Sequence, residues 1–214
     1  MSGCCCTPGF ELFGEKTARR DLRRYRRKGL AKTAQEIVEL LRQRGVEGAT
    51  LLEVGGGIGA LQVELVRAGA AGALGVDASG AYDEAAGELL RETGLEGRVE
   101  RRTADFVASA ATLAPADFVV MHRVVCCYPD ADGLVAAAAK HTRRLLVFTF
   151  PRDTWLSRLV FRGSNLWFRA IGWGFRIYVH RPAAMLAVAQ EHGLRLVDER
   201  RGLVWQTAAL EVAT

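Results

Sequence analysis

The sequence predicts an α/β fold, in which a mostly parallel sheet of seven strands carries helices on both faces and an antiparallel hairpin at one edge. A short apolar strand over 50–54 runs into a glycine-rich turn and then into a helical pattern over 60–68. Strands then alternate with helices of about a dozen residues, which is typical of a parallel sheet. The last two strands, 194–198 and 204–212, are joined by a connection too short for a crossover, so they must be antiparallel.

Two helices are expected before the first strand. The helix over 16–28 is dense in arginine and has only a thin apolar stripe, whereas the helix over 31–44 has apolar residues at helical spacing. Nine basic and two acidic residues between Glu15 and Lys32 give that segment a charge of +7. Because the net charge of the chain is +5, the remainder carries −2. The basicity is therefore local to the beginning of the chain.

The alternation that follows the glycine turn predicts four more strands before the pattern changes. Further strands are expected at 73–76, 99–103, 117–121 and 145–150, and further helices at 81–92 and 129–139. Ser79 is the expected N-terminal cap of the helix over 81–92. Pro151 is expected to end the preceding strand, because proline cannot donate a backbone hydrogen bond.

The segment 152–180 has a different composition from the rest of the chain. It contains three of the four tryptophans and five arginines, and its apolar spacing predicts a helix with an aromatic face. We expect it to form a lid, a wall of a substrate site or a surface that touches a membrane. A helix over 182–192 leads into the final hairpin.

Length and composition predict one main core with a small cap. The chain has 214 residues, of which 50 % are hydrophobic and 25 % charged. We expect an N-terminal helical cap over 1–45 and a ligand-binding domain over 46–214, with 152–180 as its lid or insertion. No apolar run is long enough to span a bilayer, and the first residues are not expected to be a secretory signal. The five cysteines form two clusters and no disulfide framework, which predicts a reducing, cytoplasmic location.

Three acidic residues indicate which nucleotide the glycine turn binds. The glycines alone also fit the dinucleotide-binding fingerprint. Glu53, just before them, suits a ligand with an ammonium group, Asp77 suits ribose hydroxyls, and Asp105 with the following ring suits an adenine. Together these groups describe S-adenosylmethionine, whose product is S-adenosylhomocysteine. The predicted cofactor-binding residues are Glu53, Gly55, Gly56, Gly57, Gly59, Asp77, Ala78, Asp105, Phe106 and Met121.

These motifs and the edge hairpin resemble class I S-adenosylmethionine-dependent methyltransferases over roughly residues 30–214. The resemblance implies a Rossmann-like methyltransferase fold. The stretches 123–129, 148–151, 178–180 and 200–203, together with 9–11, further resemble magnesium-protoporphyrin IX O-methyltransferase, a family that esterifies a porphyrin propionate. The chain departs from that family at Cys127, where the family has histidine, and at Arg123, where it has aspartate.

Several side chains are candidates for catalysis and acceptor binding. His122 and His180 are the predicted general bases, because histidine can lose its charge near neutral pH. Cys127, next to Cys126, is the third catalytic candidate, and no cysteine spacing supports a metal site. The predicted substrate-binding residues are Tyr25, Arg123, Tyr128 and Tyr178.

The arginine-rich helix leaves three interpretations open. It is a solvated helix that covers the site, a binding surface for an acidic substrate, or a surface for nucleic acid or an anionic membrane. Nucleic acid is disfavoured, because no Asn-Pro-Pro-Tyr or Asp-Pro-Pro-Tyr sequence follows the fourth strand, as it does in base-amino methyltransferases.

The leading functional hypothesis is a cytoplasmic methyltransferase that acts on an oxygen of a bulky, apolar, partly anionic small molecule. Methylation of a thiol or a soft metalloid is the alternative suggested by the cysteines. A regulatory module that binds the cofactor without turnover is an alternative of another class, and a hydride-transfer enzyme is the weakest.

Overall fold

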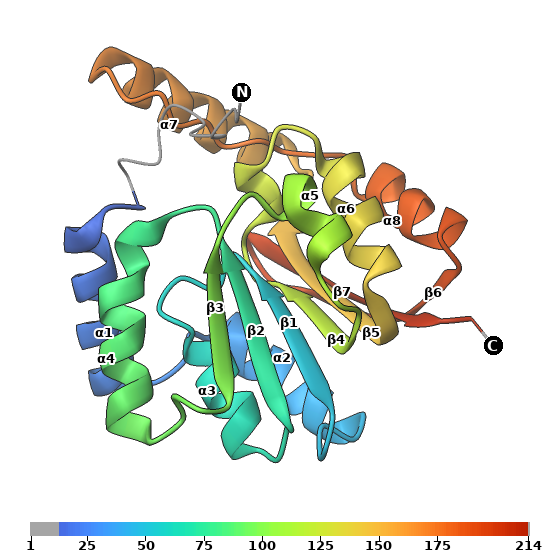
Figure 1. The fold of residues 1–214 in the computed structure, drawn as a ribbon. Helices are drawn as coiled ribbons and strands as arrows, with labels where there is room; N and C mark the ends of the chain where they lie inside the picture. The colour runs from blue at the N-terminus through green and yellow to red at the C-terminus, as the bar shows by residue number, and fades with distance from the viewer. Residues whose placement is uncertain (1–12, 214) are drawn as a thin grey trace.

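The computed structural model describes residues 13–213, which form a seven-stranded sheet with helices on both faces (Figure 1). The strands are β1 (Thr50–Val54), β2 (Gly72–Asp77), β3 (Val99–Thr103), β4 (Ala116–Met121), β5 (Thr142–Pro151), β6 (Leu194–Arg201) and β7 (Trp205–Val212). Their order across the sheet is β3-β2-β1-β4-β5-β7-β6. The first five are parallel, and β7 is antiparallel to both β5 and β6. The predicted fold class is confirmed.

Alternate residues of the central strands belong to two hydrophobic cores, one on each face of the sheet. Leu51 and Phe118 face the first core, whereas their neighbours Leu52 and Val119 face the second. The first core is covered by α1 (Glu15–Lys28), α2 (Lys32–Gln43), α3 (Ala60–Arg67) and α4 (Asp83–Thr93). The second is covered by α5 (Phe106–Ser109), α6 (Ala131–Lys140) and α8 (Pro182–Glu191). Burial on both faces explains why these strands are apolar runs and not alternating ones.

The expected start and N-terminal cap of α4 were wrong. The helix expected from residue 81 begins at Asp83, after a 3₁₀ turn over 80–82, and the Ser79 side chain does not cap it. The Ser79 hydroxyl instead donates a hydrogen bond to the carbonyl oxygen of Phe13, at 3.2 Å. The fifth strand ends at Pro151, as predicted, and Pro151 pairs with Trp205 at the end of the β5–β7 ladder, where the missing N–H of proline disrupts least.

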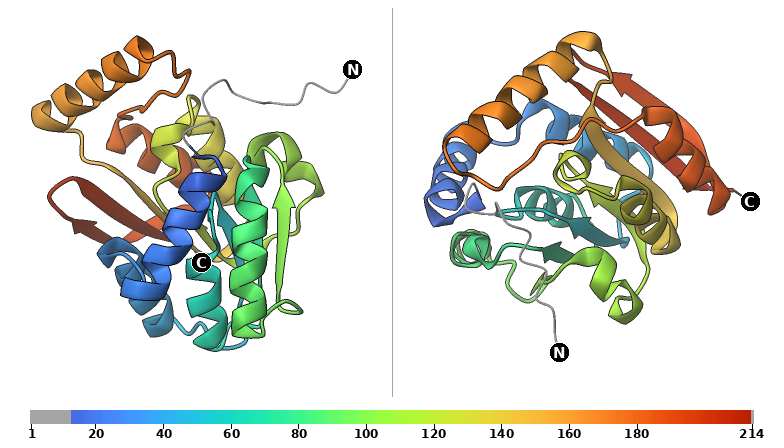
Figure 2. Two further views of the ribbon diagram at one scale, coloured as in Figure 1. Left: turned by 90° about the vertical axis from the view of Figure 1, so that its left-hand side faces the viewer. Right: turned by 90° about the horizontal axis from the view of Figure 1, so that it is seen from above.

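The arginine-rich helix α1 lies alongside α4 (Figures 1 and 2). Ala18 and Leu22 are its buried residues and join the first core. Arg19 pairs with Glu84 at 2.9 Å, and Arg26 pairs with Glu88 and Glu92 of α4. Because these ion pairs are solvent-exposed, each contributes little, and the two apolar residues do most to hold the helix.

The helix α7 (Trp155–Ala170) follows β5 at the carboxyl edge of the sheet and stands at the periphery of the molecule (Figure 2). It contains a single buried residue, Ser157, while Trp155 and Trp167 are largely exposed. The predicted helix with an aromatic face is therefore present in 152–180. Within residues 13–213, none of the helices combines the length and the hydropathy needed to cross a bilayer.

Replacing Leu22 by alanine tests what holds α1 in place. We expect Leu22→Ala to lower the free energy of unfolding by about 2–5 kcal/mol, because it removes buried methyl groups from the first core. Arg23→Ala, on the exposed side of the same helix, should change it by no more than about 0.5 kcal/mol. Urea unfolding measures both values, and equal losses in the two variants would contradict this account.

Candidate functional site

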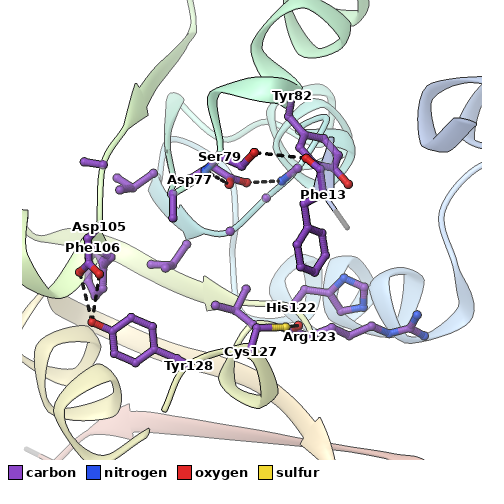
Figure 3. A pocket seen from close by; sticks show the side chains of 18 of the residues that line it. Phe13, Asp77, Ser79, Tyr82, Asp105, Phe106, His122, Arg123, Cys127 and Tyr128 are labelled. Atoms are coloured by element: carbon purple, nitrogen blue, oxygen red, sulfur yellow. Dashed lines mark hydrogen bonds between the residues drawn. The ribbon is translucent and has the colours of Figure 1, made fainter. Parts of the chain in front are cut away.

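A cavity of about 300 Å³ lies at the carboxyl ends of β1, β2, β3 and β4 (Figure 3). The chain leaves β1 toward β2 and β3 on one side and returns to β4 on the other, so β1 and β4 flank the switch point of the sheet. Ligands of open α/β sheets bind at this position. The cavity contains eleven of the predicted site residues: Gly55, Gly56, Gly57, Asp77, Ala78, Asp105, Phe106, His122, Arg123, Cys127 and Tyr128.

The glycine turn forms one wall of the cavity. Gly55 and Gly57 have φ angles of 65° and 56°, which favour glycine over other residues. A Cβ on Gly55 would lie 2.4 Å from a methyl carbon of Val124, and a Cβ on Gly57 would lie 3.3 Å from the ring of Tyr82. These two glycines let the turn approach the opposite wall closely.

Gly56 and Gly59 are required for a different reason, which is the buried pair of Glu53 and Gln62 beneath the turn. A Cβ on Gly56 would lie 2.5 Å from Glu53 Oε2, and a Cβ on Gly59 would lie 2.9 Å from Gln62 Oε1. Gly75 of β2 has the same constraint, at 2.5 Å from Gln62 Nε2. Gly56 and Gly59 therefore make room for two of the protein's own side chains beneath the turn.

Asp77 joins the end of β2 to the glycine turn. Its Oδ2 accepts a hydrogen bond from the Gly57 N–H and its Oδ1 accepts one from the Ser79 N–H, both at 2.9 Å. The carboxylate faces the cavity from the same position (Figure 3). Each oxygen keeps acceptor capacity beyond these bonds.

Asp105 and Tyr128 meet across another part of the cavity (Figure 3). The Tyr128 hydroxyl donates to the Asp105 carboxylate at 3.2 Å, and the Asp105 Oδ1 also caps α5 by accepting from the Ala108 N–H at 3.0 Å. Phe106, the first residue of α5, is buried beside them. The short helix α5 was not predicted, because four residues give no periodic signal.

His122 and Arg123 follow β4 and share a hydrogen-bond partner, Thr33 of α2. The His122 Nε2 lies 2.9 Å from the Thr33 hydroxyl, and the Arg123 guanidinium donates to the same oxygen at 3.1 Å. Burial, and then repulsion from Arg123, lowers the pKa of His122 to about 4. The imidazole is therefore neutral at pH 7 and a weak base.

Arg123 is held in an unusual conformation. Its φ of 59° places a non-glycine residue in the left-handed region, and its N–H donates to the Thr149 hydroxyl at 2.7 Å. Its guanidinium lies 4.7 Å from the ring centroid of Trp205. Within residues 13–213, no carboxylate is within ion-pair distance of it and its buried Nε has no hydrogen-bond partner, while burial lowers its pKa. Arg123, which lines the cavity, thus carries a positive charge that lacks a counter-ion among these residues.

Glu53, for which a direct contact with the ligand was predicted, is not among the residues that line the cavity. It is only 2 % exposed, and Gln62, which is completely buried, lies beside it under the turn. Burial raises the pKa of Glu53 to about 7, although the Gln62 amide and the Arg101 charge act in the opposite direction. Across the described part of the chain, Glu53 Oε2 and both polar atoms of the Gln62 side chain find no hydrogen-bond partner.

Five other predicted site residues also lie away from the cavity wall. Gly59 begins α3 against Gln62, and Met121 is completely buried in the second core. The Tyr25 hydroxyl turns to Glu64 of α3 and donates a hydrogen bond to it. His180 Nε2 lies 3.0 Å from the Tyr128 carbonyl oxygen, and Tyr178 stacks on the His180 ring.

The two cysteines after β4 lie side by side, with their sulfur atoms 3.7 Å apart. Cys127 lines the cavity and Cys126 is buried. The hydrogen bond with Cys126, and then burial, raises the pKa of the Cys127 thiol, which disfavours a thiolate. No group of three metal-ligating side chains occurs in residues 13–213, and Cys4, Cys5 and Cys6 lie outside them.

Comparisons with solved structures place this architecture among known proteins. Magnesium protoporphyrin IX methyltransferase from Synechocystis PCC 6803, with bound S-adenosylhomocysteine, superposes with a TM-score of 0.69 at 20 % identity, covering 85 % of this chain and 82 % of that one. An O-methyltransferase family protein from Burkholderia thailandensis gives 0.67 at 17 % identity, covering 87 % of this chain and 58 % of that one. The fold is that of class I methyltransferases.

The methyltransferase fold does not by itself establish the reaction. The cyclase SpnF also superposes, with a TM-score of 0.60 at 15 % identity, over 84 % of this chain and 80 % of its own. Searches with the sequence found no matching protein-family profile and no matching curated protein. The function must therefore be argued from the residues of the cavity.

Several residues of this methyltransferase fold reach the cavity without having been predicted. Phe13, Asp21 and Tyr82 line it, and the Tyr82 hydroxyl donates to Asp21 at 3.2 Å. The arginine-rich helix α1 thus contributes an acid to the site and directs its paired arginines to α4. Asp21 is one of only two acids among the basic residues of this segment, which is the one signal that could have drawn attention to it.

The buried carboxyl of Glu53 predicts a pH-dependent stability. Its folded pKa, about 7, is above the ordinary value of 4.5, so its contribution to stability is full below pH 4.5 and is lost as the pH rises to 7. Glu53→Gln should therefore raise the free energy of unfolding relative to wild type by up to about 3 kcal/mol at pH 8, and by much less at pH 4.5.

Urea unfolding of both proteins at several pH values measures this difference. Glu96→Gln, which removes an exposed carboxyl, is the matched control and should show no comparable trend. A difference between wild type and Glu53→Gln that stays constant from pH 4.5 to pH 8 would mean that the Glu53 carboxyl is not perturbed by burial.

Proposed function

We propose that the chain is an S-adenosylmethionine-dependent methyltransferase that methylates an oxygen of a bulky, partly anionic small molecule. The observation that carries this proposal is the pair of carboxylates, Asp77 and Asp105, which follow successive strands and line the same cavity as the glycine turn. The similar methyltransferase from Synechocystis PCC 6803 was crystallised with bound S-adenosylhomocysteine, which supports the same cofactor here.

The side chains around the cavity fit this cofactor. Asp77 offers acceptor oxygens for ribose hydroxyls while it remains bonded to the Gly57 and Ser79 N–H groups. Asp105 and Phe106 offer an acceptor and a ring for the adenine. Gly57, which has no Cβ, leaves its backbone open to the ligand beside Tyr82.

In this proposal Glu53 positions the glycine turn and does not touch the ligand. Its carboxyl and the Gln62 amide fill the space under Gly56 and Gly59, so they hold the turn from below. We assign both as positioning residues.

The chain's part in the reaction is mainly alignment. S-adenosylmethionine supplies a methyl group already activated by its sulfonium. The cavity residues need to hold the acceptor oxygen in line with that methyl group and keep water away, and good orientation supplies roughly 7–11 kcal/mol of the barrier reduction. The apolar side chains of Val54, Ile58, Val124 and Leu134, which line the cavity, serve this exclusion of water.

Arg123 supports an anionic acceptor. Arg123 lines the cavity, and its guanidinium has no carboxylate partner in the described residues. Its position is set by Thr33, Thr149 and Trp205. A guanidinium in this state suits a carboxylate ligand. A carboxylate acceptor is already ionised at pH 7, so it needs no general base, which agrees with the low pKa of His122.

The thiol or metalloid alternative has weaker support. The adjacent sulfur atoms of Cys126 and Cys127 favour it, and their hydrogen bond lowers the pKa of Cys126. Cys126 is buried, however, and the pKa of Cys127, the thiol that lines the cavity, is raised, which disfavours a thiolate facing a soft acceptor. The non-catalytic alternative is distinguished from a methyltransferase by the reaction product, because a regulatory module forms no S-adenosylhomocysteine.

Substitution of Asp77 tests the cofactor assignment. We expect Asp77→Asn to weaken the binding of S-adenosylhomocysteine by at least about 10-fold, because hydrogen bonds to a charged acceptor are lost. Isothermal titration measures the affinity, and Asp132→Asn, an exposed acid on α6, is the control that should leave it unchanged. Tight binding of NAD without binding of S-adenosylhomocysteine would overturn the proposal.

Substitution of Arg123 tests the acceptor class. The assay follows S-adenosylhomocysteine release with magnesium protoporphyrin IX and a panel of aromatic carboxylic acids as acceptors. For any acid that turns over, Arg123→Gln should raise KM by about 10-fold or more while the affinity for S-adenosylmethionine stays within about twofold. Arg143→Gln, an exposed arginine at the start of β5, is the control. An unchanged KM would show that Arg123 does not hold the acceptor.

A further inference from the structure

The helix α7 presents two apolar rows to solvent. The first row is Trp155, Leu159 and Leu166, and the second is Leu156, Val160 and Trp167. Both rows follow the same spacing, so they form adjacent stripes along one side of the helix. All six residues are more than half exposed, with Trp155 at 76 % and Trp167 at 62 %. Exposed apolar surfaces of this kind mark sites of interaction.

The other side of α7 is already occupied. Asn165 exchanges two hydrogen bonds of 2.8 Å with the backbone of Ile177, and Phe168 packs against Trp173 and Phe175 in the segment that returns from the helix. Figure 2 shows this segment running along the inner side of α7. The helix is therefore held to the protein by one face, and its two apolar rows point away.

A row of positive charge runs beside the first apolar row. Arg158, Arg162 and Arg169 repeat the spacing of the apolar rows, so they form a third stripe on the helix. No acidic residue occurs from 154 to 190. Arg158 pairs with Asp153 at 2.6 Å, whereas no ion pair is formed by Arg162 or Arg169 within the described chain.

The tip of the β6–β7 hairpin extends this surface. Leu203, at the tip, is 88 % exposed. The Arg152 N–H donates to the Val204 carbonyl oxygen at 2.8 Å, and its guanidinium donates to the Gly202 carbonyl oxygen at 3.2 Å. These two bonds fix the hairpin tip to Arg152, which lies three residues before the start of α7. Both elements lie at the carboxyl edge of the sheet, as the cavity does.

We propose that α7 and the hairpin tip form a docking surface for an anionic lipid bilayer, with the two apolar rows inserted at the interface and the arginine row on the lipid headgroups. Tryptophan and leucine on one face and arginine on the next are the composition of helices that lie in the membrane interface. A second copy of the chain fits this surface less well, because it would bring arginine rows together and offer no acidic residue from 154 to 190.

Vesicle sedimentation tests the proposal with the full chain. We expect the protein to sediment with vesicles of phosphatidylcholine and phosphatidylglycerol, and to bind at least about 10-fold more weakly to phosphatidylcholine alone or at high salt. Leu159→Glu/Leu166→Glu should weaken binding by at least about 10-fold. Ala111→Glu/Gln190→Glu, which makes the same change in net charge at exposed sites off this surface, should bind within about threefold of wild type.

Two further measurements test whether the leucine variant is folded and whether the tryptophans of the wild type reach the lipid chains. Thermal unfolding of the Leu159→Glu/Leu166→Glu variant should match wild type, since both leucines are exposed. Lipids brominated along their chains should quench the tryptophan fluorescence of the wild type. Absence of binding to the anionic vesicles, or equal binding by the two double variants, would overturn the proposal. A wild-type dimer that the leucine substitutions dissociate, without vesicle binding, would assign the surface to a second copy of the chain.

Discussion

The buried pair of Glu53 and Gln62 is the constraint on which the site depends. Their polar groups occupy the space directly beneath the glycine turn, and a Cβ on Gly56, Gly59 or Gly75 would lie less than 3.0 Å from them. The two side chains thereby support the turn in the position in which the Gly57 N–H donates a hydrogen bond to Asp77. A motif that looks like a cradle for a ligand is thus half explained by the packing of two protein side chains.

The remaining walls of the cavity come from the ends of neighbouring parallel strands. Asp77, Asp105 and Arg123 follow β2, β3 and β4, so the topology of the sheet alone brings them to one edge. Arg123 is the most constrained of the three, because α2, β5 and β7 each supply one of its partners. A charge fixed in this way loses little entropy when it binds an anion, which is why we assign it to the acceptor.

The two helices that carry rows of arginine, α1 and α7, have different surroundings. On α1, arginines meet the glutamates of α4, and the buried Leu22 holds the helix to the first core. On α7, Arg162 and Arg169 have no acidic neighbour in the described structure, and the apolar residues face solvent. Arg19 and Arg26 of α1 are therefore paired within the fold, whereas Arg162 and Arg169 of α7 form no ion pair and lie beside an exposed apolar face.

The sequence by itself determined the fold class and half of the residues that line the cavity, because strand and helix periods and the position of residues after strands are local properties. It therefore predicted the glycine turn, Asp77, Asp105 and Arg123 at one edge of the sheet. Only the tertiary structure decided that Glu53 lies beneath the turn, that Tyr25 and His180 turn away, and that Asp21 and Thr33 reach the site. Those outcomes depend on how helices distant in sequence pack against the strands, and no local spacing encodes that packing.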